Sequence, residues 1–159
     1  MNLYDIQINL LNGEALDFSK YRGKKVMIVN TASACGLTPQ YAQLQELYEY
    51  NHELVEVIGV PCNDFAGQEP GTAEEIQQFC DINYKISFPL TEKVKIKGDD
   101  IHPLYQFLTQ KSLNQLQDSE VSWNFQKYLL DESGALIHVF SPQTEVLSEE
   151  VFKAIGISL

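Results

Sequence analysis

The chain has 159 residues, of which 44% are hydrophobic and 21% are charged, and these proportions favour one globular domain over a disordered or fibrous chain. Asp and Glu number 22 against 11 Lys and Arg, and the net charge of −11 repels phosphate backbones and anionic lipids. We therefore expect no nucleic-acid partner and no membrane insertion. The N-terminus has neither the basic flank nor the apolar core of a signal peptide, so we expect a cytoplasmic protein with a single domain over residues 1–159.

The first half of the chain predicts a hairpin, two buried strands and two helices. Apolar residues alternate on both sides of Asn12-Gly13, which is typical of a β-hairpin. The apolar runs 24–30 and 54–60 predict strands that are covered on both faces. Thr38 before a proline predicts the N-cap of one helix, and Thr72-x-x-Glu75 predicts a capping box that opens a second.

The second half predicts shorter elements. Residues 86–90 favour a short strand, residues 103–110 a helix, and the runs 125–130 and 135–140 two strands joined by a tight turn. Ser148 begins a final short helix. This order predicts an α/β, thioredoxin-like fold: a central mixed sheet flanked by helices, with a parallel pair, an antiparallel pair and an N-terminal β-hairpin.

The three cysteines, Cys35, Cys62 and Cys80, are too few for a secreted disulfide scaffold. No two of them form a Cys-x-x-Cys pair, and none lies at zinc-site spacing from a histidine, so we expect no metal site. Each is therefore either a small buried apolar residue or a reactive thiol.

Cys35 has the most reactive position of the three. It lies between a predicted buried strand and a predicted helix N-terminus, where free backbone N–H groups favour a thiolate over a thiol. Gly36 lets a substrate approach closely. The alternative is a buried loop cysteine without a chemical role.

Three further side chains could act as hydrogen-bond donors. Gln68 follows the second strand, where α/β sheets place functional loops, although it could equally be an ordinary loop amide. Trp123, the only tryptophan, precedes Asn124, and both offer N–H groups. The alternative for Trp123 is a core residue whose N–H is satisfied by a carbonyl.

Together these segments resemble the glutathione peroxidase family. The stretch 28–41 (IVNTASACGLTPQY) is similar to the peroxidatic segment of that family. The segments PCNDF at 61–65, GQEPG at 67–71, FPL at 88–90, HPLY at 102–105 and WNFQKY at 123–128 match in the same order. The resemblance covers nearly the whole chain.

This resemblance implies a peroxidase that reduces hydrogen peroxide and organic or lipid hydroperoxides to water or alcohols through a sulfenic acid on Cys35. It implies a catalytic tetrad of Cys35, Gln68, Trp123 and Asn124, whose last three members donate to the departing oxygen. Cys80 occupies the place of a resolving cysteine, whereas Cys62 is interpreted as structural. It implies a monomer without a bound cofactor, reduced by thioredoxin or glutathione.

Three other functions stay open on the sequence. A peroxide sensor or redox relay would pass the oxidised state of Cys35 to a partner protein. A peroxiredoxin would need an arginine beside its nucleophile, and Arg22 is the only arginine. A non-catalytic binding module would leave Cys35 no more reactive than free cysteine.

Overall fold

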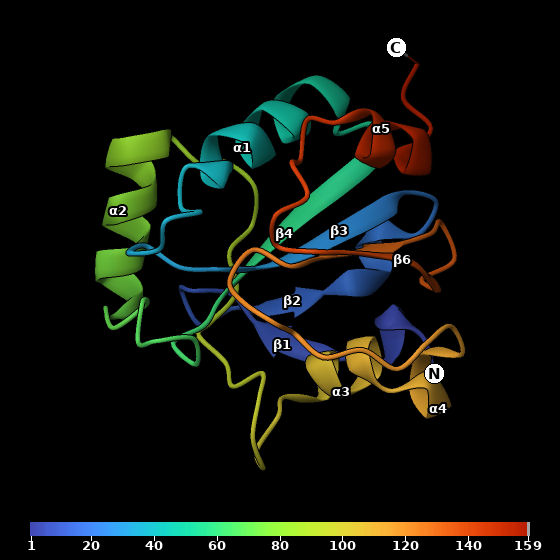
Figure 1. Cartoon of the computed structure of the whole chain (residues 1–159), viewed down its shortest axis with the longest axis horizontal. Coiled ribbons are helices and arrows are strands. Elements are labelled where there is room, and N and C mark those ends of the chain that lie inside the picture. The colour runs from blue at the N-terminus through green and yellow to red at the C-terminus, as the bar shows by residue number, and fades with distance from the viewer. Residues whose placement is uncertain (159) are drawn as a thin grey trace.

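A four-stranded mixed sheet forms the centre of the molecule (Figure 1). The computed structural model describes residues 1–158. The strand order is β4-β3-β5-β6; β3 pairs in parallel with β4 and antiparallel with β5, and β5 pairs antiparallel with β6. A separate antiparallel pair, β1-β2, forms the N-terminal hairpin. The strands are β1 (Gln7–Asn9), β2 (Ala15–Asp17), β3 (Lys25–Thr31), β4 (Val55–Pro61), β5 (Lys127–Leu130) and β6 (Leu136–Phe140).

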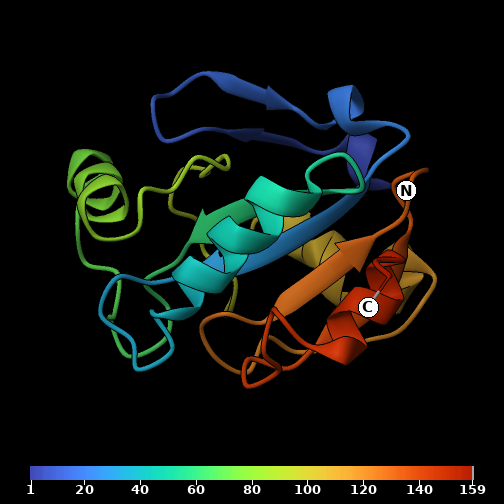
Figure 2. The same ribbon diagram turned by 90° about the horizontal axis from the view of Figure 1, so that it is seen from above.

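Helices cover both faces of this sheet. Successive residues of β3 point to opposite faces, so Met27 and Val29 pack into one apolar cluster and Val26 and Ile28 into the other. Figures 1 and 2 show α1 and α5 on the first face and the hairpin with α3 on the second. The helices are α1 (Gln40–Asn51), α2 (Ala73–Tyr84), α3 (Pro103–Thr109), α4 (Lys111–Asn114) and α5 (Glu149–Ile155), with short 3₁₀ turns at Leu3–Asp5 and Phe18–Tyr21.

Local capping signals mark two helix starts as predicted. Thr72 accepts a hydrogen bond from the backbone N–H of Glu75, whose carboxylate accepts from the N–H of Thr72 in return, which completes the capping box of α2. Ser148 caps α5 in the same position through Val151 N–H. The predicted hairpins, buried strands and sheet pairing are likewise confirmed.

Two predicted elements are wrong. Residues 86–90 do not form a strand, because this segment makes only isolated β-bridges. Leu90 forms one with Gly59 of β4, and the next residue, Thr91, forms one with Leu10 after β1. Thr38 is not a helix cap, because α1 begins two residues later and Pro39 occupies the N-cap position. The Thr38 hydroxyl is used instead inside the loop that precedes the helix.

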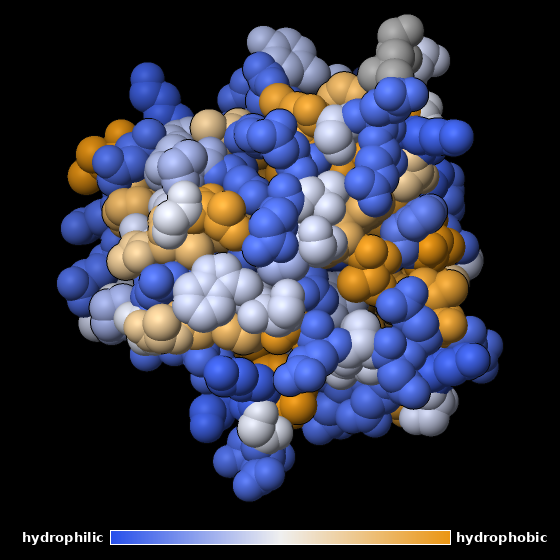
Figure 3. Space-filling model, in the orientation of Figure 1, coloured by the Kyte–Doolittle hydropathy of each residue, from blue (hydrophilic) through white to orange (hydrophobic). Residues whose placement is uncertain are grey.

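Most of the face shown in Figure 3 is covered by hydrophilic side chains, with apolar side chains gathered in patches between them. Across residues 1–158, no helix is long and apolar enough to cross a membrane.

Gly59 lets the segment after α2 cross the edge of the sheet closely. Its N–H donates to Pro89 O at 3.0 Å and its carbonyl accepts from Thr91 N–H at 2.9 Å. A Cβ at this position would meet Leu90 Cδ2 at 2.6 Å and Phe88 Cε1 at 3.2 Å. The absence of a side chain is therefore required by packing rather than by backbone conformation.

We predict that Gly59→Ala lowers the free energy of unfolding by about 1–3 kcal/mol, the usual cost of overpacking a core. Urea titration followed by circular dichroism measures it. Gly36→Ala is the matched control, because its Cβ would meet nothing within 4 Å. Equal stability of Gly59→Ala and the wild type would contradict this interpretation of the packing.

Candidate active site

The loop that leaves the carboxyl end of β3 holds Cys35 in a fixed turn. The side chain of Cys35 is 9% exposed, and its Sγ accepts a hydrogen bond from the backbone N–H of Leu37 at 3.3 Å. The N–H of Cys35 donates to Thr38 Oγ1 at 2.9 Å, and this hydroxyl donates to Ala32 O at 2.8 Å. The side chain of Cys35 is therefore nearly buried, and one backbone amide donates to its sulfur.

The amide on the sulfur comes from a turn and not from the first turn of a helix. The sequence predicted a helix capped by Thr38 with Pro39 as its first residue, whereas α1 begins at Gln40 with Pro39 in the N-cap position. Between them, consecutive tight turns join Thr38 N–H to Cys35 O and Gln40 N–H to Leu37 O. The amide that donates to the sulfur, that of Leu37, therefore belongs to the turns that precede α1.

Gln68 and Asn124 meet at this loop from two other parts of the chain. The carbonyl of Gln68 accepts from Ala34 N–H at 3.0 Å, which ties the loop after β4 to the residue before Cys35. Asn124 Nδ2 donates to Gln68 Oε1 at 3.0 Å, so the amide nitrogen of Gln68 remains a donor. Within residues 1–158, the fully buried Asn124 Oδ1 has no hydrogen-bond partner.

Trp123 is positioned by a residue that the sequence did not single out. The fully buried side chain of Asn30, at the end of β3, donates through Nδ2 to Trp123 O at 3.1 Å. The backbone of Asn30 accepts from Phe125 N–H at 2.6 Å, and Phe125 has a left-handed φ of 66°. The indole ring lies 5.7 Å from that of Phe65 and packs against both apolar clusters.

Glu69 is a second site residue that sequence reasoning missed. Its carboxylate is 1% exposed and accepts from Ser33 Oγ at 3.1 Å. Burial raises the pKa of Glu69, while the hydrogen bond from Ser33 and the charge of Lys93 oppose the shift. The ammonium of Lys93 donates to the backbone carbonyls of Glu69 and Gly71. The one sequence signal for the Ser33–Glu69 contact is that Glu69 directly follows Gln68 in the predicted functional loop.

The three cysteines are free thiols that belong to two different clusters. Cys35 and Cys80 pack in the cluster under α1, whereas Cys62 packs in the cluster on the opposite face of the sheet. Burial raises the pKa of Cys80 to about 11, although the nearby Tyr41 hydroxyl lowers it, and burial raises the pKa of Cys62 to about 12. Both are therefore neutral thiols in the folded protein.

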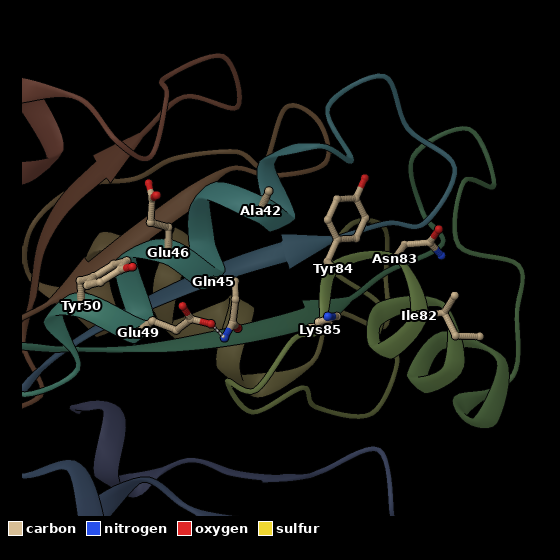
Figure 4. A pocket seen from close by; sticks show the side chains of 9 residues that line it. All are labelled: Ala42, Gln45, Glu46, Glu49, Tyr50, Ile82, Asn83, Tyr84 and Lys85. Atoms are coloured by element: carbon tan, nitrogen blue, oxygen red, sulfur yellow. Dashed lines mark hydrogen bonds between the residues drawn. The ribbon is translucent and has the colours of Figure 1, made fainter.

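One hollow lies away from this site. Figure 4 shows it between α1 and the C-terminal end of α2, with Gln45 hydrogen-bonded to Glu49 at 2.9 Å on one side. Its volume is about 330 Å³. Tyr50 and Ile82 at its border are both 77% exposed. None of the predicted site residues lines it.

Known proteins resemble the chain along almost its full length. The family model for glutathione peroxidase matches residues 3–109. A "Glutathione peroxidase" from Lactococcus lactis is 44% identical over 156 residues, which cover 96% of this chain and 99% of that protein. The "Glutathione peroxidase-like peroxiredoxin 2" of Saccharomyces cerevisiae is 39% identical and covers 91% of this chain and 90% of its own length.

Solved structures agree with the sequence relatives. The crystal structure of T. cruzi GPX1 superposes with a TM-score of 0.76 and 30% sequence identity, covering 98% of this chain and 94% of that one. This similarity confirms the thioredoxin-like fold class that the order of elements predicted. On the family model and these relatives together, the chain belongs to the glutathione peroxidase family and is a peroxidase.

Proposed function

We propose that the chain reduces hydroperoxides with Cys35 as nucleophile and Gln68, Trp123 and Asn124 as its hydrogen-bonding partners. The observation that carries this proposal is the pair of contacts at Gln68. Its backbone holds the residue before Cys35, and its side chain is oriented by Asn124. Three chain segments far apart in sequence thus converge beside one thiol.

The chemistry needs an ionised sulfur and donors for the oxygen that leaves. The Cys35 sulfur attacks one peroxide oxygen, the O–O bond breaks, and the departing oxygen takes a proton to become water or an alcohol. The free amide nitrogen of Gln68 can donate to the developing negative charge. Asn124 orients the Gln68 amide through the hydrogen bond from its Nδ2. None of these partners has to change its own charge.

Cys80 is the cysteine that resolves the resulting sulfenic acid. It shares the apolar cluster of Cys35, whereas Cys62 lies across the sheet. The last turn of α2 closes on the carbonyl of Cys80, which accepts from both Lys85 N–H and Ile86 N–H. Lys85 has a left-handed φ of 51°. Opening this turn releases Cys80 from burial, which restores an ordinary thiol acidity and lets its sulfur attack.

Thioredoxin is the reductant that the charges favour over glutathione. Glutathione is an anion and would need a positive charge near Cys35. The only arginine, Arg22, lies before β3 and Cys35 lies after it, so the two residues are at opposite ends of that strand. Arg22 stacks on the Tyr4 ring at 4.1 Å. The ammonium of Lys93, beside the site, is bound to two carbonyls. Little positive charge remains to hold a small anionic thiol.

Replacing the nucleophile should abolish the activity. Cys35→Ser leaves a hydroxyl that is not ionised at neutral pH, so we expect peroxide consumption to fall to the uncatalysed background. An NADPH-coupled assay with the thioredoxin system measures it, with hydrogen peroxide as substrate. Retained consumption would refute the assignment of Cys35.

Removing one donor should slow the oxidation without stopping it. We expect Gln68→Ala to reduce the rate constant for oxidation of Cys35 roughly a hundredfold, the usual effect of losing one donor to a developing anion. Stopped-flow fluorescence of Trp123 follows the reaction. Gln77→Ala, on the exposed surface of α2, is the control. A rate within twofold of the wild type would exclude Gln68 from the site.

The resolving cysteine is tested by turnover. Cys80→Ser should consume one equivalent of peroxide per chain and then stop in the presence of thioredoxin and its reductase. Cys62→Ala is the matched control and should keep turning over. Normal turnover by Cys80→Ser would show that another group resolves Cys35.

The reductant is tested by comparing turnover of the wild type with the thioredoxin system and with the glutathione system. Equal rates with the two systems would overturn the choice of thioredoxin.

A further inference from the structure

An apolar cavity lies between the Cys35 loop and α2. Its volume is about 280 Å³, the space of roughly nine water molecules at about 30 Å³ each. On the loop side it is lined by Ser33 and Ala34, and on the helix side by Ile76 and Phe79. Pro70 closes it from the loop that carries Gln68. The peroxidase mechanism described above gives this cavity no role.

The cavity adjoins the loop that carries Cys35, although the proposed catalytic side chains themselves do not line it. Ala34 directly precedes the nucleophile, and its N–H is bound to Gln68 O. Ile76 packs in the same apolar cluster as Cys35 and Cys80. A group attached to a peroxide oxygen at Cys35 therefore has apolar walls within reach, and it can leave water by entering them.

Charge at the cavity limits what can enter. Glu69 and Glu75 contribute to its lining, and the chain as a whole carries −11. An uncharged alkyl or aryl group fits this lining, whereas a carboxylate would be repelled. The volume suits a short alkyl or aryl group rather than a whole lipid.

The helix side of the cavity belongs to the same helix that carries Cys80. Of the residues of α2, only Ile76 and Cys80 are buried within the described chain, and Phe79 is half-buried. Figure 2 shows α2 at the edge of the molecule, where the ring of Tyr84 lies 5.5 Å from that of Tyr41 of α1. A helix with so few buried side chains opens at low cost, and an apolar group packed against Ile76 and Phe79 adds contacts that resist this opening.

We propose that this cavity holds the organic group of the hydroperoxide and that, while the group remains, α2 stays closed and Cys80 cannot reach Cys35. The inference rests on the peroxidase function and on Cys80 as the resolving cysteine. Departure of the alcohol is the step that permits disulfide formation. With hydrogen peroxide the product is water, which does not fill the cavity, so disulfide formation is not delayed.

The atoms balance in two separate steps. First the sulfur of Cys35 gains oxygen as the O–O bond breaks, and the organic alkoxide takes a proton and becomes the alcohol. After the alcohol leaves, the thiol of Cys80 loses its proton and its sulfur attacks that of Cys35. The S–S bond forms, the S–O bond breaks, and the departing hydroxide takes a proton and becomes water.

A single-turnover experiment tests the order of these steps. The reduced protein is oxidised with one equivalent of hydrogen peroxide in rising concentrations of 2-phenyl-2-propanol, the alcohol that cumene hydroperoxide yields. Alkylation at timed intervals and mass spectrometry measure the rate of the Cys35–Cys80 disulfide. We expect the rate to fall in proportion to the fraction of chains whose cavity is empty, and to approach zero as the cavity fills.

Two variants locate the effect. Phe79→Ala removes a wall, so about tenfold more alcohol should be needed for the same slowing. Ile82→Ala, whose side chain points away from the molecule on the same helix, should respond like the wild type (Figure 4). Glycerol at equal concentration controls for a solvent effect.

The inference would be wrong if the alcohol did not slow disulfide formation, or if it slowed Phe79→Ala and the wild type equally. The proposed peroxidase function would be unaffected by either result. If hydrogen peroxide alone gave no oxidised Cys35, the proposed nucleophile would be wrong. If it gave a sulfenic acid but no disulfide with Cys80, the proposed resolving step would be wrong. In both cases this inference would be wrong too, and the sample without added alcohol would already show the reason.

Discussion

The candidate active site depends on one buried asparagine near the end of the central strand β3. Asn30 is fully buried, and its side chain and backbone bind Trp123 O, Phe125 N–H and Gln126 N–H. A buried amide left without these partners would cost about 1–3 kcal/mol, so the contacts strongly determine where the segment lies. The same strand, one residue later, begins the loop to Cys35. The end of β3 thus holds the segment of Trp123 and Asn124 next to the strand from which the Cys35 loop begins.

The rest of the site is positioned by the carboxyl ends of β3 and β4. β3 and β4 are parallel, so their carboxyl ends deliver the Cys35 loop and the Gln68 loop side by side, as open α/β sheets do. The hydrogen bonds from Ala34 to Gln68 and from Ser33 to Glu69 then join the two loops. Cys35, the proposed nucleophile, lies in a loop that two parallel strands anchor, whereas Cys80, the proposed resolving cysteine, lies on a helix with few buried side chains. The division matches chemistry that needs precision in one step and movement in the next.

The sequence predicted the sheet, the hairpins and the capped helices because each depends on neighbours in the chain. The capping box of Thr72 and the alternation around Asn12-Gly13 are such local signals. Contacts that join distant residues were not readable. Asn30 looked like the end of an apolar run, Thr38 like a helix cap, and residues 86–90 like a strand. Gln68 and Asn124 could be named through resemblance, but their direct hydrogen bond could be seen only in the fold.

The central claim is that Cys35 is oxidised and that Cys80, on the same face of the sheet, closes the disulfide. Peptide mapping by mass spectrometry, after one equivalent of hydrogen peroxide and rapid alkylation, tests this most directly. The account predicts one disulfide between Cys35 and Cys80 with Cys62 alkylated as a free thiol. A disulfide that contains Cys62, or a Cys35 that remains a free thiol, would contradict it.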